Sequence, residues 1–118
     1  EESLHGDKLK TARRLFTKKI ITSLPDVIIT SNDLIAQGII SAAHENGINI
    51  PNDMQITGFD DLLSSAYFIP SVTTVSQNID ELAKRCFSML MDLINKKSSV
   101  SSIIEQNIIA RNSAKINI

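Results

Sequence analysis

Polar side chains that could hold a ligand follow two short apolar runs of this chain. Asn32 comes soon after residues 27–30, and Asp60 comes directly after residues 55–59. If both runs are parallel strands, their carboxyl ends lie at the sheet edge where α/β proteins bind ligands. A carboxylate accepts hydrogen bonds from neighbouring hydroxyls, whereas an amide both donates and accepts them. A third polar segment, residues 70–77, ends in Gln77.

The first half of the chain has the pattern needed to position these side chains. Apolar spacing with cations near the end predicts a helix over 8–22, and Pro25 closes that segment. The β-branched run 27–30 is typical of a strand buried on both faces. A second helix is predicted over 33–46, with Gly47 suited to the left-handed position that ends it, followed by a strand over 55–59.

The second half continues the alternation. A short helical turn is expected over 62–67, an extended segment over 72–76, a long helix over 78–97 and a last strand over 103–109. Asn78 and Glu81 are spaced like a capping box, and Cys86 lies on the apolar stripe as a small core residue. The whole pattern, without repeats, predicts an α/β fold with an open parallel sheet flanked by helices.

Composition limits the possible classes of protein. With 118 residues and a net charge of −1, the chain is one domain or a piece of one, without the positive surface that nucleic acids require. A single cysteine excludes an internal disulfide framework and fits a reducing compartment, so a cytoplasmic location is expected. No apolar run approaches the roughly 20 residues that span a bilayer, so no membrane association is expected.

Several motifs together resemble the lactose/galactose repressor family of bacterial transcription regulators. They are Pro25-Asp26-Val27-Ile28, Ser31-Asn32-Asp33 with Ala36 and Gly38, Gly47-Ile48, Ile50-Pro51 with Asp53, Gly58-Phe59-Asp60-Asp61, Pro70, Thr73-Thr74-Val75, Gln77, and Arg111-Asn112-Ser113. The match is dense over residues 24–97 and loose over residues 1–23.

The resemblance implies the C-terminal portion of a two-lobed, periplasmic-binding-protein-like (type I) effector domain. Residues 1–76 would lie in the C-terminal lobe, residues 77–100 would cross into the N-terminal lobe, and residues 101–118 would return as a strand and tail. The protein would be no enzyme and would need no cofactor. Its partners would be a small-molecule effector, either a sugar or a sugar derivative, a second copy in a homodimer, and operator DNA through a headpiece absent from this chain.

The resemblance also assigns residues. Asn32 and Asp60 match the family's ligand contacts, and Gln77 is a weaker candidate at the crossover between lobes. An amide and a carboxylate together suit the hydroxyls of a polyol, and a charge-assisted hydrogen bond is the stronger of the two. The segment after the acidic doublet is expected to form a dimer surface through Leu62, Leu63, Tyr67 and Phe68.

Structural roles are also open for the same residues. Asn32 is a favoured residue for capping the next helix, and Asp33 fits capping better than binding. An Asp-Asp doublet after a strand is often a turn, and both roles can coexist, with Asp60 directed to the cleft and Asp61 to the backbone.

Two other functions remain as alternatives. A sugar-binding protein of a transporter shares the two-lobed fold, although Ile50-Pro51 and the segment 73–77 favour the repressor branch. A phospho-acceptor receiver domain has this length, but no lysine follows a later strand to complete its site. Enzymes with nucleotide-binding, nucleophile-elbow or zinc-histidine motifs are disfavoured because those motifs are absent from the sequence.

Overall fold

The computed structural model describes residues 7–98 and 100–115. In chain order the elements are α1 (Lys8–Leu15), the π-helical segment η1 (Phe16–Ile20), β1 (Val27–Ile29), α2 (Asp33–Glu45), β2 (Gln55–Thr57), α3 (Leu63–Tyr67), β3 (Thr74–Ser76), α4 (Ile79–Ile94) and β4 (Asn107–Ile109). The alternation of helices and strands is as expected, and the strands are shorter than the apolar runs that predicted them.

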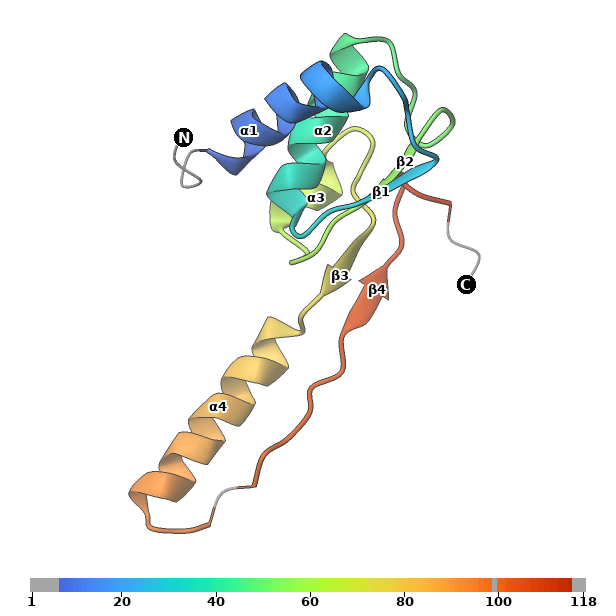
Figure 1. The fold of residues 1–118 in the computed structure, drawn as a ribbon. Helices are drawn as coiled ribbons and strands as arrows, with labels where there is room; N and C mark the ends of the chain where they lie inside the picture. Colours follow the sequence, from blue (N-terminus) through green and yellow to red (C-terminus); the bar gives the residue numbers. More distant parts are fainter. Residues whose placement is uncertain (1–6, 99, 116–118) are drawn as a thin grey trace.

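A compact body contains α1, α2, α3 and the parallel pair β1–β2 (Figure 1). Strand β1 pairs with β2 in the register Ile28 to Ile56, and a parallel bridge from Thr57 to Thr73 continues the pairing toward β3. The largest buried apolar side chains belong to η1, α2, β2 and the residues just before β2 and β3, and they are Phe16, Ile40, Met54, Ile56 and Val72. The predicted parallel sheet is therefore present in this body.

Helices α1 and α2 pack closely because Gly38 has no side chain. A Cβ atom at this position would lie 2.6 Å from the backbone oxygen of Leu9. Across the same contact the Arg13 guanidinium bonds the Ser41 hydroxyl and forms an ion pair with Glu45 (2.7 Å). Helix α2 ends as predicted, with Gly47 at φ 72°. Both helices thus have fixed positions over the strands whose ends carry the polar residues.

Strand β1 is not buried on both faces as its apolar run predicts. Val27 is 48% exposed and Ile29 is 81% exposed, while Ile28 packs against the core. The described helices cover only one face of this strand, so its outward-facing β-branched side chains remain in solvent. A continuous apolar run indicates a strand that is suited to burial on both faces. Burial of the second face still requires another element to pack against it.

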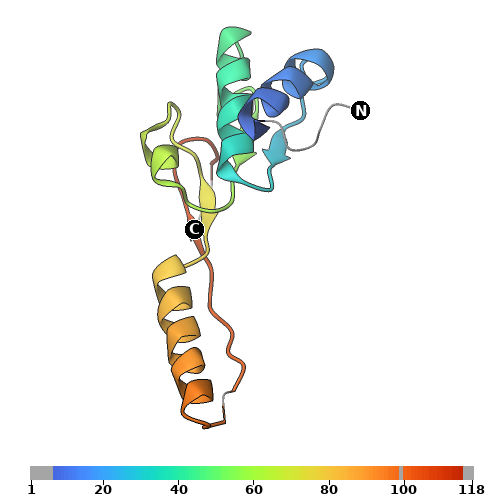
Figure 2. The ribbon, with the colours of Figure 1, turned by 90° about the vertical axis from the view of Figure 1, so that its left-hand side faces the viewer.

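An arm extends from the body and consists of α4 and residues 100–109 (Figures 1 and 2). Strands β3 and β4 are antiparallel at its base, with Val75 opposite Ile108. The structure measures 59 × 41 × 22 Å and has a radius of gyration of 18.0 Å. A compact domain of this length would have a radius of gyration of about 13 Å, so the arm makes the chain elongated.

Two expectations for α4 are wrong. None of its residues is buried, and Cys86 is exposed rather than in a core. The Asn78 side chain makes no capping hydrogen bond, because its backbone lies in the left-handed region at φ 51° instead of the extended conformation of an N-cap. Within the described part of the chain, no helix is both long and apolar enough to cross a membrane.

Candidate functional site

The carboxyl ends of the parallel strands meet at one edge of the body. The Thr30 N–H donates to the Thr57 carbonyl (3.0 Å), and the Asp33 N–H donates to the Phe59 carbonyl (2.8 Å). On the other side of β2, the Gly58 N–H donates to the Thr73 carbonyl (2.8 Å). These bonds place the start of α2 beside residues 58–61, which is the arrangement that the polar residues after each strand predict.

Asn32 is the N-cap of α2. Its side-chain oxygen accepts a hydrogen bond from the Ile35 N–H (3.0 Å), and the residue is 9% exposed. The structural role left open for Asn32 is therefore the one its contacts show. Since the cap uses the carbonyl end of the amide, the NH2 end is the part that could donate to a ligand.

Asp60 and Gln77 lie together, although 17 residues separate them. The Gln77 Nε2 donates to Asp60 Oδ1 at 2.6 Å, and both side chains are half-buried. The Asp60 N–H donates to the Val75 carbonyl (3.0 Å), which attaches the turn to β3. A carboxylate has about four acceptor positions, so Asp60 has capacity beyond its bond to Gln77. The structure thus joins two of the three predicted ligand contacts into one pair.

The turn that carries this pair has an unusual backbone. Asp60 has φ 110° and Asp61 has φ 52°, and both values lie in the range that residues with a side chain rarely adopt. Such conformations cost on the order of 1–3 kcal/mol each and persist only where surrounding contacts determine them. Neighbouring groups must therefore hold this turn.

One holding group is Asp33, whose importance the sequence did not indicate. It does not cap a helix as expected, because Asn32 does so; its carboxylate is fully buried. It accepts hydrogen bonds from the Leu62 N–H (2.8 Å), the Ser65 hydroxyl (2.7 Å) and the Thr74 hydroxyl (2.6 Å). One carboxylate thereby connects α2 to the end of the turn, to α3 and to β3.

Gly58 makes room for that carboxylate. A Cβ atom at Gly58 would lie 2.0 Å from Asp33 Oδ1, far inside any contact distance. The buried polar group also extends to Gln37, whose Nε2 donates to the hydroxyls of Ser64 (2.9 Å) and Ser65 (3.0 Å). The only signals in the sequence were a glycine after a strand and two polar residues on an apolar helix face.

Asp61 is held by the C-terminal motif. Its Oδ1 lies 2.6 Å from Nη2 of Arg111, so the carboxylate is directed to a guanidinium and not to the backbone as expected. Two residues later, the fully buried Ser113 hydroxyl donates to the Ile56 carbonyl (2.7 Å) and accepts from the Thr73 N–H (2.8 Å). The Arg-x-Ser segment therefore connects the returning chain to β2 and to the segment before β3.

The predicted dimer residues divide into two groups. Leu63 and Tyr67 are each 78% exposed on α3, one turn apart. Leu62 is half-buried, and Phe68 packs against the core of the body. Ile69, which the sequence did not single out, is 89% exposed just after α3. The free apolar surface here thus consists of Leu63, Tyr67 and Ile69.

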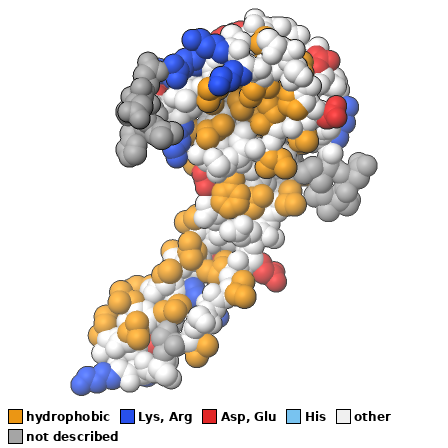
Figure 3. Space-filling view, viewed as in Figure 1, with side chains coloured by type: hydrophobic (Ala, Val, Ile, Leu, Met, Phe, Trp, Pro, Cys, Tyr) orange, Lys and Arg blue, Asp and Glu red, His pale blue; other side chains and the backbone are white. Residues whose placement is uncertain are grey.

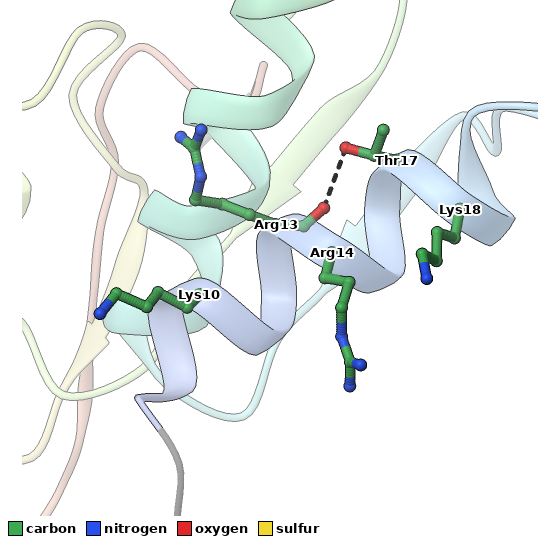
Figure 4. A pocket seen from close by; sticks show the side chains of 5 residues that line it. All are labelled: Lys10, Arg13, Arg14, Thr17 and Lys18. Atoms are coloured by element: carbon green, nitrogen blue, oxygen red, sulfur yellow. Dashed lines mark hydrogen bonds between the residues drawn. The ribbon is translucent and has the colours of Figure 1, made fainter. Parts of the chain in front are cut away.

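A separate groove lies along α1 and η1. Lys10, Arg13, Arg14, Thr17 and Lys18 line it, all from one face of this helical segment (Figure 4). Lys and Arg side chains gather over the same end of the body (Figure 3). None of the predicted ligand contacts, Asn32, Asp60 and Gln77, lines this groove. It is therefore distinct from the candidate strand-end site to which these three residues belong. Among the described residues, no group of three or more His, Cys, Asp or Glu side chains is placed to hold a metal ion.

Comparisons with known proteins agree with this geometry. The periplasmic binding protein-like domain family matches residues 2–114. The HTH-type transcriptional repressor PurR of Pasteurella multocida is 35% identical over 95 residues, which are 79% of this chain and 28% of that protein.

Solved structures give the same result. The ribose operon repressor of Lactobacillus acidophilus superposes with a TM-score of 0.82 and 31% identity over 98% of this chain and 43% of the other. A LacI family regulator from Enterococcus faecium with bound ribose gives a TM-score of 0.81 and 25% identity over 90% of this chain and 40% of the other.

The chain spans between 24% and 28% of the length of the curated relatives it matches. Its parallel strands, its strand-end site and its protruding arm are those of part of a larger domain. The chain therefore belongs to the periplasmic binding protein-like domain family, as a portion of an effector-binding domain of the lactose/galactose repressor (LacI/GalR) type.

Proposed function

We propose that this chain is the effector-sensing part of a bacterial transcriptional repressor that works in the cytoplasm. The observation that carries the proposal is the Asp60–Gln77 pair beside the capped start of α2, at the edge where the strands end. Open α/β sheets bind ligands at this edge. Because the curated relatives are repressors, a repressor is favoured over a sugar-binding protein of a transporter. Operator DNA would be bound only by a headpiece outside this chain.

The effector class that we propose is a sugar or a sugar derivative. Asp60 offers a charged acceptor, and the amides of Asn32 and Gln77 offer donors, which together suit neighbouring hydroxyl groups. One similar structure is a ribose operon repressor and another holds ribose. A pentose is therefore the first ligand to test.

A purine base is the second candidate. The relatives with 35–38% identity are HTH-type transcriptional repressors that carry the name PurR. A purine also presents donors and acceptors that amides and a carboxylate can bind. A purine base differs from a sugar in one requirement, because a base needs a stacking or apolar surface. The strand-end site formed by Asn32, Asp60 and Gln77 is polar, which favours the sugar.

The arm supports the division of the chain between two lobes. We propose that residues 1–76 lie in the C-terminal lobe, that residues 77–100 cross into the N-terminal lobe, and that residues 101–118 return. The exposed apolar side chains of α4 include Phe87, Leu90 and Leu93, and they would be covered by the rest of the domain. The strand-end residues would then form one wall of a cleft whose other wall is outside this chain.

We also propose a homodimer that pairs through the α3 surface. Leu63, Tyr67 and Ile69 supply its apolar contacts, Leu62 is half-buried beside them, and Phe68 anchors the surface to the core. Apolar side chains exposed to this degree in one patch are typical of an interaction site.

A thermal-shift screen of the full-length protein tests the effector site. The panel contains D-ribose, other pentoses and hexoses, their phosphates, and purine bases. The Asp60→Ala variant should lose the stabilisation that a true effector produces, because it removes the charged acceptor. Asp26→Ala is the matched control, since this aspartate is exposed at the opposite, amino-terminal end of β1.

The outcomes separate the candidates. A shift with a pentose that Asp60→Ala abolishes and Asp26→Ala retains supports the sugar proposal, and the same result with a purine supports the second candidate. A ligand whose shift survives Asp60→Ala would place the effector site elsewhere.

A further inference from the structure

We propose that Arg111 is a positioning residue for the effector site. Through Asp61 it holds residues 60–61 in the backbone conformation that presents the Asp60 carboxylate. The inference rests on the proposed function for Asp60, but the holding role itself can be measured without any ligand.

The turn needs such a holder because its conformation is unfavourable by itself. Two successive aspartates have positive φ, at 110° and 52°. A chain segment released from its neighbours would leave this region for the extended or right-handed conformations that side chains prefer. The direction of the Asp60 side chain depends on that backbone, so a relaxed turn would no longer present the carboxylate in the same place.

Hydrogen bonds hold both ends of the turn, one to β3 and one to α2. Before its centre, the Asp60 N–H donates to the Val75 carbonyl (3.0 Å). After its centre, the Leu62 N–H donates to the buried Asp33 carboxylate (2.8 Å). Between them, the Asp61 N–H makes only a long bond of 3.4 Å to the Thr74 hydroxyl. The centre of the turn thus depends on its side chain for a firm attachment.

Arg111 supplies that attachment. Its Nη2 lies 2.6 Å from Asp61 Oδ1, and its Nη1 donates to the Val72 carbonyl (2.9 Å). Its own backbone N–H donates to the Thr73 hydroxyl (2.9 Å), so the residue is fixed at both ends. The side chains are only 18% and 26% exposed, which limits the screening of the ion pair by solvent. A planar guanidinium with several donors can bridge a carboxylate and a carbonyl in this way, whereas lysine has one charged nitrogen.

The attachment comes from a distant part of the sequence. Arg111 and Asp61 are 50 residues apart, and the segment between them contains β3 and the whole arm. The conformation of the turn at residues 60–61 therefore depends on whether the returning segment, which carries Arg111, packs against the body. Arg111 affects the effector only through Asp61 and the neighbouring Asp60.

The first test is hydrogen exchange of the full-length protein without ligand. Arg111→Gln should raise the hydrogen-exchange rate of a peptide covering residues 58–62 about tenfold, while the exchange rates of α2 peptides stay the same. Arg111→Lys, which retains the charge, should give a smaller rise. Arg85→Gln is the matched control, because Arg85 is an exposed cation on α4. Unchanged exchange at residues 58–62 in a folded Arg111→Gln protein would overturn the proposal.

A second variant guards against loss of folding. If Arg111→Gln does not fold, Asp61→Asn removes the carboxylate charge but keeps a residue that tolerates positive φ. It should produce the same local rise in exchange. A rise spread over the whole body would indicate a general structural role and would contradict the positioning role.

The second readout is the affinity for D-ribose. Arg111→Gln should weaken it about tenfold in the wild-type background and not further in Asp60→Ala. Additive losses would contradict action through Asp60. If wild-type protein does not bind D-ribose, ribose is excluded as the effector, and the exchange measurement still decides the role of Arg111.

Discussion

The body and the arm have the same kind of sequence pattern and opposite environments. In the body, helix α2 buries Ala36, Ile39 and Ile40 almost completely. In the arm, helix α4 has an apolar stripe of equal regularity and buries none of its residues. Hydrophobic side chains are visible along the arm, which extends to the lower left (Figure 3). The apolar spacing therefore identifies the helix face that is suited to packing. Whether another element packs against that face depends on the fold.

The difference has an energetic meaning. A helix of 16 residues is marginal in water without tertiary packing, because nucleation is costly and each added residue contributes little. The body supplies that packing to α2 through β2, α1 and η1. Helix α4 lacks it within the described chain, which fits a chain that is a portion of a larger domain.

The largest effect should come from matched phenylalanine substitutions. Phe16→Ala should destabilise the chain by about 3–5 kcal/mol, because the side chain is fully buried in the core. Phe87→Ala should cost less than about 0.5 kcal/mol, because Phe87 is 65% exposed on α4. Equilibrium urea unfolding of the 118-residue chain measures both.

The same two substitutions in the full-length protein test whether α4 is covered there. If the rest of the domain covers α4, Phe87→Ala should there approach the cost of Phe16→Ala. A cost that stays small in both proteins would mean that α4 is not an internal surface, and the proposed lobe assignment would be wrong.

A smaller effect is expected for two aspartates. Asp33→Ala should cost about 3 kcal/mol, since it leaves the buried donors of Leu62, Ser65 and Thr74 without their acceptor. Asp80→Ala on the arm should cost only a few tenths of a kcal/mol, because Asp80 is exposed in the first turn of α4. Urea midpoints of the two variants give the comparison. Equal losses would show that the carboxylate of Asp33 does not hold the body together.

The smallest effect should separate the two helix starts. Asn32→Ala should cost about 1 kcal/mol, because it removes the cap bond to the Ile35 N–H. Asn78→Gly should be neutral within a few tenths of a kcal/mol, because Asn78 makes no cap bond and glycine accepts φ 51°. Thermal unfolding followed by circular dichroism detects both changes. A clear loss with Asn78→Gly would contradict the observed start of α4.

Most elements could be predicted from local pattern. The helices over α2 and α4, the stop at Gly47 and the strands at β1 and β2 were expected within a few residues. These features depend on neighbours one to four residues away, which periodicity and turn chemistry report directly. The common edge of the strands was also predicted, because parallel pairing brings equivalent ends together.

The predicted site was less complete than the predicted fold. Asn32 and Asp60 were singled out, but the pairing of Asp60 with Gln77 joins residues 17 apart. The role of Asp33 was misjudged, because an aspartate at a helix start looks the same whether it caps or is buried. Whether these residues bind an effector stays a prediction.

Local spacing was enough to predict the order of helices and strands, the apolar face of each helix and the polar residues that end the strands. Which apolar faces are covered and which distant groups meet became known from the folded chain, as in the ion pair that Arg111 forms with Asp61 across 50 residues. Burial and long-range pairing depend on what packs against each face in three dimensions, and a linear pattern does not contain that information.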